Sequence, residues 1–125
     1  MAIGFKQLQT TAFRIDSPLV LESLGNLAYA KAKSGDLDKA TQIYNGVLLA
    51  QETLHGKESQ EYNETVGILG FLCAQKLEYG NALKLLLLAL QWQEANLGMG
   101  HPAVLYTRDS IKEVERKALG TAEWV

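Results

Sequence analysis

The sequence predicts an all-α protein in which antiparallel helical hairpins are stacked as an α-solenoid. Small and turn residues recur with a 42-residue period, so that Ala40 is matched by Ala82 and Ser17 by Ser59. Apolar residues follow a helical period, and no segment shows the alternation typical of a strand. A fixed period of this length is typical of stacked helical units, each unable to bury its apolar face alone. Such an architecture favours a binding scaffold over a catalyst.

The repeat divides the chain into about 2.5 units. One domain is expected over 1–119, followed by a C-terminal tail at 120–125. In chain order the domain consists of a partial second helix at 2–13, a first repeat at 17–56, a second repeat at 59–98 and a closing first helix at 101–119.

Turn residues mark the ends of the predicted helices. Pro18 and Pro102 fit the first position of a helix, where the missing N–H of proline has no intrahelical partner to lose. Ser34-Gly35 ends the first helix, and Asp36 is expected to cap the second. The stripe that should face the core in the first repeat contains Leu21, Leu24, Leu27, Ala28 and the stem of Lys31 on the first helix, and Leu37, Ala40, Ile43, Tyr44, Val47 and Leu48 on the second.

Small residues are expected to set the distance between the two helices of a hairpin. Ala28 and Gly70 occupy equivalent places on the first helices, and Ala40 and Ala82 on the second. A bulkier residue at any of these places would overpack the hairpin.

Composition excludes several functional classes. With 12 Lys+Arg against 14 Asp+Glu, the net charge of −2 provides no basic surface for a nucleic acid or an anionic membrane. The single cysteine, Cys73, excludes a disulfide within the chain. Residues 1–14 lack a secretory signal, and the longest apolar run, 85–90, is too short to cross a bilayer. We therefore expect a cytoplasmic protein with no nucleic-acid partner and no membrane insertion.

No set of side chains indicates catalysis or metal binding. His55 and His101 lie in successive turns, without a further ligand at the spacing of a metal site. Cys73 lies on the predicted buried stripe, as is typical of a packed small residue. The chain is therefore expected to have no enzymatic activity, no cofactor and no metal.

The first hairpin combines Leu24-Gly25-Asn26-Leu27-Ala28, then Gly35-Asp36-Leu37-Asp38-Lys39-Ala40, and then Tyr44. In these residues it resembles the tetratricopeptide repeat. The 42-residue period and the segment Leu97-Gly98-Met99-Gly100-His101-Pro102-Ala103-Val104 are similar to the longer repeat of kinesin light chains. The sequence departs from the family at four positions. Lys31 and Cys73 stand where the family usually has tyrosine, Gln60 replaces the turn proline, and Leu77 replaces the glycine before the second helix.

This resemblance implies a protein or peptide partner, bound extended in a concave groove that the first helices of the repeats line. It implies that Asn26 binds the backbone of the ligand and that Tyr29 and Phe71 form the walls of an apolar pocket. It also implies that the cationic side chains of Lys33, Arg116 and Lys117 bind a carboxylate of the ligand. The implied partner-binding residues are Glu22, Asn26, Tyr29, Lys33, Glu64, Phe71, Gln75, Asp109, Arg116 and Lys117.

Each of these residues also has a structural interpretation. Tyr29 and Phe71 either contact a ligand or close the seam between helices. Asn26 either binds a peptide or ties neighbouring helices together. The charged residues either recognise a partner or form an ordinary solvated face.

The leucine-rich run at 83–90 favours a second function. Leu87 and Leu88 stand where the first repeat has Asn45 and Gly46, and a helix cannot turn all of these leucines inward. An exposed apolar patch usually marks an interface, so a structural or assembly subunit that forms a homo-oligomer is the alternative. The candidate interface is Leu85, Leu87, Leu88 and Trp92. The alternative is that neighbouring repeats or the segment 122–125 cover this patch, in which case the leucines form no interface between copies of the chain.

Overall fold

The computed structural model describes residues 17–123, and their side chains as far as Gly120. This part of the chain is almost wholly helical and contains no strand, which confirms the all-α prediction. The chain divides into two compact units, unit one (Met1–Tyr62) and unit two (Asn63–Val125), and each is described by itself. The helix predicted at 2–13 lies outside the described residues.

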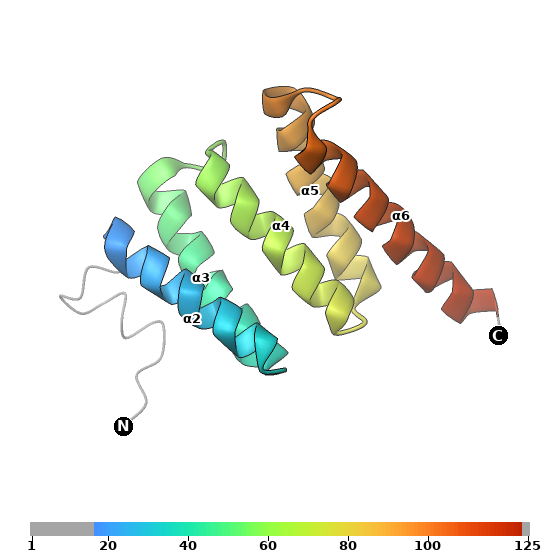
Figure 1. Cartoon of the computed structure of the whole chain (residues 1–125), viewed down its shortest axis with the longest axis horizontal. Coiled ribbons are helices and arrows are strands. Elements are labelled where there is room, and N and C mark those ends of the chain that lie inside the picture. Colours follow the sequence, from blue (N-terminus) through green and yellow to red (C-terminus); the bar gives the residue numbers. More distant parts are fainter. Residues whose placement is uncertain (1–16, 124–125) are drawn as a thin grey trace. The chain divides into compact units, whose positions relative to one another are not determined.

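The helix boundaries recur with the period of the sequence (Figure 1). α2 and α4 each have 16 residues, α3 and α5 each have 19, and each helix of the second pair begins one full repeat after its counterpart. The described helices are α2 (Pro18–Lys33), α3 (Leu37–His55), α4 (Gln60–Gln75), α5 (Tyr79–Leu97) and α6 (Pro102–Glu123).

The last helix is longer than expected. We predicted that it ends near Leu119 and that a tail begins at Gly120, whereas α6 continues to Glu123. Glycine inside a helix costs only about 1 kcal/mol relative to alanine and is a weak stop without a further signal. No proline follows Gly120 in this chain.

Unit one contains α2 and α3, which run antiparallel and side by side (Figure 1). Leu21 and Leu24 of α2 pack with Val47 and Ala50 of α3. The side chain of Asp36 accepts a hydrogen bond from the backbone N–H of Lys39 at 3.1 Å, as expected for the cap of α3.

One residue of the predicted stripe in unit one points elsewhere. Leu27 is 47% exposed, whereas Leu21 and Ala28 are buried. Each helical residue is rotated by about 100° from the one before it, so Leu27 and Ala28 cannot both face the same way. The predicted stripe was therefore too wide at this position.

Unit two contains α4, α5 and α6, and α5 lies behind the other two helices in the view of Figure 1. Its core cluster joins Cys73 of α4, Ala82 and Leu86 of α5, and Ile111 and Val114 of α6. Gly70 makes the close approach that we expected: a Cβ there would lie 2.9 Å from Leu86 Cγ and 3.2 Å from the Leu86 backbone nitrogen.

Polar contacts hold the turn between α5 and α6. His101 Nδ1 accepts a hydrogen bond from the Ala103 N–H at 3.0 Å, so this histidine caps α6. Arg108 Nε donates to Glu94 Oε2 at 3.2 Å and thereby joins α6 to α5. Both side chains are partly buried, which shields this ion pair from solvent more than an ordinary surface pair.

We predict that Gly70→Ala lowers the free energy of unfolding by about 1–3 kcal/mol, because the new methyl group meets the backbone and side chain of Leu86. Gly80→Ala in α5 is the matched control, since a Cβ there meets no described atom within 4 Å. Alanine should raise stability at that position by up to about 1 kcal/mol. Urea unfolding followed by circular dichroism measures both effects. Equal changes in the two variants would contradict the close packing at Gly70.

We predict that Leu77→Gly stabilises the chain by roughly 0.5–1 kcal/mol, because the left-handed backbone is unfavourable for a residue with a Cβ atom. Leu77 has φ 64° and is 70% exposed, so its side chain contributes little packing. The equivalent position of the first repeat is Gly35, with φ 92°. Leu88→Gly, within α5, should instead destabilise by about 1 kcal/mol or more. A lower melting temperature for Leu77→Gly would show that the leucine stabilises this turn.

Candidate functional site

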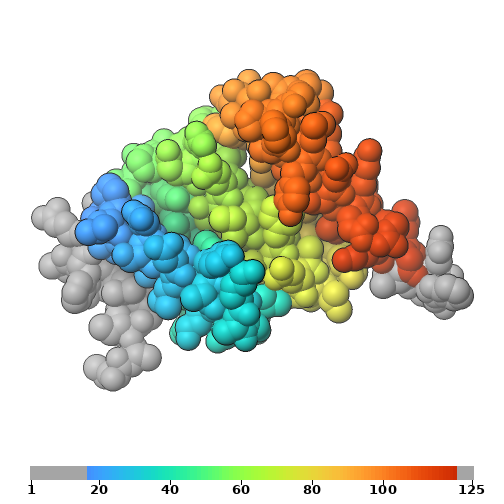
Figure 2. Space-filling view, viewed as in Figure 1, coloured from blue at the N-terminus to red at the C-terminus, as the bar shows by residue number. Residues whose placement is uncertain are grey.

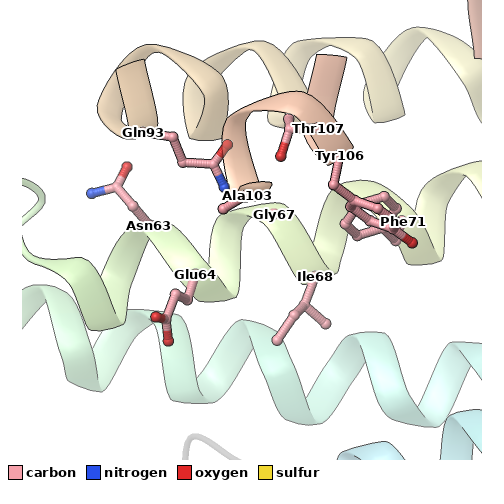
Figure 3. A pocket seen from close by; sticks show the side chains of 9 residues that line it. All are labelled: Asn63, Glu64, Gly67, Ile68, Phe71, Gln93, Ala103, Tyr106 and Thr107. Carbon is pink, nitrogen blue, oxygen red and sulfur yellow. The ribbon is translucent and has the colours of Figure 1, made fainter. Parts of the chain in front are cut away.

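Unit two contains an open pocket of ≈ 300 Å³ between α4, α5 and α6 (Figure 3). Figure 2 shows atoms of both α4 (green to yellow) and α6 (orange to red) at this face of unit two, with a hollow between them. The pocket is lined by Asn63, Glu64, Gly67, Ile68 and Phe71 of α4, Gln93 of α5, and Ala103, Tyr106 and Thr107 of α6.

The α4 side of the pocket follows from helical spacing. Asn63, Gly67 and Phe71 are four residues apart and therefore lie above one another on one face, with Glu64 and Ile68 beside them. Gly67 contributes only backbone to this face. A Cβ at Gly67 would be 3.6 Å from the Cβ of Ala89, so the glycine also faces α5.

Two aromatic rings form one end of the pocket. The ring centroids of Phe71 and Tyr106 are 5.5 Å apart, and the ring planes are tilted by 54°. This geometry is favourable for an aromatic pair. Phe71 packs against the core cluster, whereas Tyr106 is 65% exposed. The pair therefore offers an incoming group an apolar surface on a rigid support.

Polar groups occupy the other end of the pocket. Asn63 and Thr107 are buried. The amide of Gln93 lies beside Ala103 (Figure 3), and its Oε1 is shielded from solvent without a hydrogen-bond donor among the described residues. Leaving a buried acceptor unpaired costs about 1–3 kcal/mol. The pocket thus retains an unused acceptor group.

Among the described residues that line the pocket, Glu64 has the only charged side chain. Arg108 follows Thr107 in α6, but its guanidinium is engaged with Glu94 and, through Nη2, with Met99 Sδ at 3.3 Å. The charge of the lining is therefore negative.

The cations predicted on α6 have partners on their own helix. Arg116 Nε donates to Glu113 Oε2 at 3.1 Å, and Lys117 Nζ lies 3.9 Å from Glu113 Oε1. The hydrogen bond from Arg116 lowers the pKa of Glu113 below its ordinary value. Asp109 is exposed on the same helix. Exposed pairs of this kind contribute little to stability, and a bound carboxylate would have to compete with Glu113.

The other predicted groove residues lie elsewhere. Glu22, Asn26, Tyr29 and Lys33 belong to α2 of unit one, where they are exposed. Lys33 Nζ lies 5.5 Å from the centroid of the Tyr29 ring, a cation–π distance. Gln75 is exposed at the end of α4.

The pocket brings together Glu64 and Phe71 from the predicted set, and the lining residues that the sequence analysis missed are Asn63, Gln93, Ala103 and Thr107. Gln93 is the counterpart of Gln51 in the first repeat, and this recurrence was an available signal. Asn63 stands where the first repeat has the buried Leu21, so a polar residue at a core position was a second signal. Ala103 and Thr107 had no comparable signal.

Only part of the candidate interface on α5 is exposed to solvent. Leu87 and Leu88 are 48% and 54% exposed. Leu85 packs against the core cluster of unit two, and Trp92 is partly buried. The exposed apolar surface is therefore centred on Leu87 and Leu88.

The remaining sequence predictions concern the Cys73 thiol, metal binding and membrane insertion. Burial raises the pKa of the Cys73 thiol, Glu78 raises it further and Lys76 opposes the shift, so the reactive thiolate is disfavoured. Within residues 17–123 no group of three His, Cys, Asp or Glu side chains is arranged to hold a metal ion. No helix of this described part is both long enough and apolar enough to span a membrane.

No protein-family model matches the chain, and a comparison with curated proteins finds no match.

Proposed function

We propose that the chain is a non-catalytic protein–protein interaction module that binds an extended peptide or partner segment. In this proposal it is a short α-solenoid of about 2.5 tetratricopeptide-like repeats, and the first helices of the repeats carry the ligand. The recurrence of helix lengths and boundaries from one repeat to the next supports stacked hairpins of one kind. The left-handed backbone at both Gly35 and Leu77 supports equivalent turns.

The observation that carries the proposal is the pocket beside Phe71 and Tyr106. Both rings come from first helices of the proposed repeats, α4 and α6, and Glu64 lies on the same face of α4. At ≈ 300 Å³ the pocket is at the small end of ligand sites, a size that suits one side chain of a longer ligand. Exposed aromatic residues are frequent energetic centres of protein interfaces.

The proposal includes a cytoplasmic location and no catalytic role. The single thiol, Cys73, is free and buried, which suits a compartment where disulfides are rare. Among the described residues that line the pocket there is no nucleophile with an adjacent base.

Tyr106→Ala should weaken binding of peptides selected on the wild-type chain from a random displayed library by about tenfold or more. Tyr106 is largely exposed, so its truncation should leave the fold intact. Leu105→Ala is the matched control, because Leu105 is its exposed neighbour on α6 and lies outside the pocket lining. Fluorescence anisotropy with labelled peptides measures the affinities. Equal affinities of the peptides for Tyr106→Ala and Leu105→Ala would show that the pocket does not bind them.

A second candidate function is favoured by the exposure of Leu87 and Leu88. Two adjacent leucines, both about half exposed, give α5 an apolar surface that a second copy of the chain can cover. In this alternative the chain is an assembly subunit whose homo-oligomer is held by α5.

Sedimentation equilibrium tests the alternative. The wild-type chain should show the mass of a dimer or larger species, and Leu87→Asp combined with Leu88→Asn should show that of a monomer, because charged and polar groups resist burial. Leu49→Asp is the control, since Leu49 is similarly exposed on α3. A wild-type chain that is monomeric at its highest soluble concentration would exclude self-association.

A further inference from the structure

We propose that an exposed face of α2 binds residues 2–13 of the same chain, in the way that α6 packs on the helix before it. We call this surface the outer α2 face, and it comprises Val20, Ser23, Leu27 and Ala30. Binding at this face involves neither the pocket of unit two nor a peptide ligand. It can therefore be absent while the proposed function stands, and the reverse also holds.

Unit two shows which side of a first helix packs on the second helix before it. α5 and α6 lie side by side (Figure 1). Ile111 and Val114 of α6 share a buried cluster with Leu86 of α5. Residues three or four positions apart lie on one face of a helix. The buried residues of this face of α6 are Val104, Thr107, Ile111 and Val114.

The outer α2 face consists of the same four positions two repeats earlier, but it is open. Leu27 is 47% exposed, whereas its counterpart Ile111 is 8% exposed. Ser23 and Ala30 are exposed as well. The helix that would precede α2 falls at 2–13, outside the described residues. Stacked repeats bury such faces against their neighbours, so α2 presents a packing surface whose cover lies outside residues 17–123.

The equivalent positions of α4 agree with this interpretation. Leu69 and Leu72, which correspond to Leu27 and Ala30, are buried. A hydroxyl side chain also recurs at one place of this face in all three first helices, as Ser23, Thr65 and Thr107. A face that is kept in three helices and buried in two of them is expected to be buried in the third.

Residues 2–13 have side chains suited to this role. With two repeats added to each number, they align with 86–97 of α5. Phe5 and Leu8 then stand where α5 has the buried Ala89 and the partly buried Trp92. A glutamine recurs at one place in this segment and in both second helices, as Gln9, Gln51 and Gln93. The segment therefore matches a second helix in its apolar and its polar positions.

The place of the segment in the chain favours it over a separate molecule. Residues 98–101 join α5 to α6, and a connection of the same length, 14–17, joins the segment to α2. A short connection gives the attached segment an effective concentration on the order of millimolar at its binding face. A second copy of the chain would have to exceed that concentration to displace it.

Nuclear Overhauser effects measured on the whole chain test the proposal. Ala2 is the counterpart of Leu86, and Leu27 is that of Ile111, so protons of Ala2 and Phe5 should show contacts with the methyl groups of Leu27. A sample mixed from isotope-labelled and unlabelled chains identifies the source of any contact. Contacts between differently labelled chains would assign the face to a second copy and overturn the proposal, as would the absence of contacts from residues 2–13.

Melting temperatures of matched variants give a second test. Leu27→Ser should lower the melting temperature by about 4 °C or more, because a covered leucine loses its apolar burial. Leu49→Ser changes a leucine of similar exposure on α3 and should shift the melting temperature by about 1 °C at most. Equal shifts in these two variants would contradict a covered outer α2 face.

A double variant shows whether the segment is what covers Leu27. Phe5→Ser should lower the melting temperature by itself, and Phe5→Ser combined with Leu27→Ser should lose clearly less than the sum of the two single losses. Gln7→Ser is the control, since the counterpart of Gln7 in α5, Gln91, is exposed. Additive losses would show that Phe5 and Leu27 do not meet and would reject the proposal.

Discussion

The close contact between Gly70 and Leu86 is the constraint on which unit two depends. Leu86 is fully buried, and it fits against α4 only because position 70 has no Cβ atom. This contact keeps α4 close to α5, and Ile111 and Val114 then join α6 to the same cluster. The pocket lies between these three helices, so the positions of its walls depend on this packing contact. Binding residues on such a supported helix lose little freedom when a ligand arrives.

The helical part of the fold was predictable because local and repeated signals agree. Pro18, Asp36 and the glycines after each second helix mark ends that the period of the sequence then repeats. The prediction was wrong where a local signal stood alone. Gly120 did not end α6, since a single glycine is a small penalty when no proline or capping residue follows. Leu27 was placed in the core because it is apolar, although the narrower stripe through Leu21 and Ala28 excludes it.

The site was less predictable than the fold, for a physical reason. Glu64 and Phe71 were indicated by their place on a first helix, which a repeat pattern supplies. Gln93 and Thr107 come from two other helices, and their convergence is a property of packing that no spacing in the sequence encodes. Polar residues in such places are counted as surface when only periodicity is read. The pairing of Arg116 with Glu113 was visible in the i,i+3 spacing, but only the hydrogen-bond geometry shows that the guanidinium is held by this carboxylate.

The equal lengths of α2 and α4, and of α3 and α5, have a consequence for how such a chain changes over evolutionary time. Because equivalent helix ends are separated by one constant interval, misaligned recombination between two copies of the coding sequence adds or deletes a whole hairpin and leaves every remaining helix in phase. Point substitutions can then diversify one copy, as Leu77 and Asn63 differ from their counterparts Gly35 and Leu21.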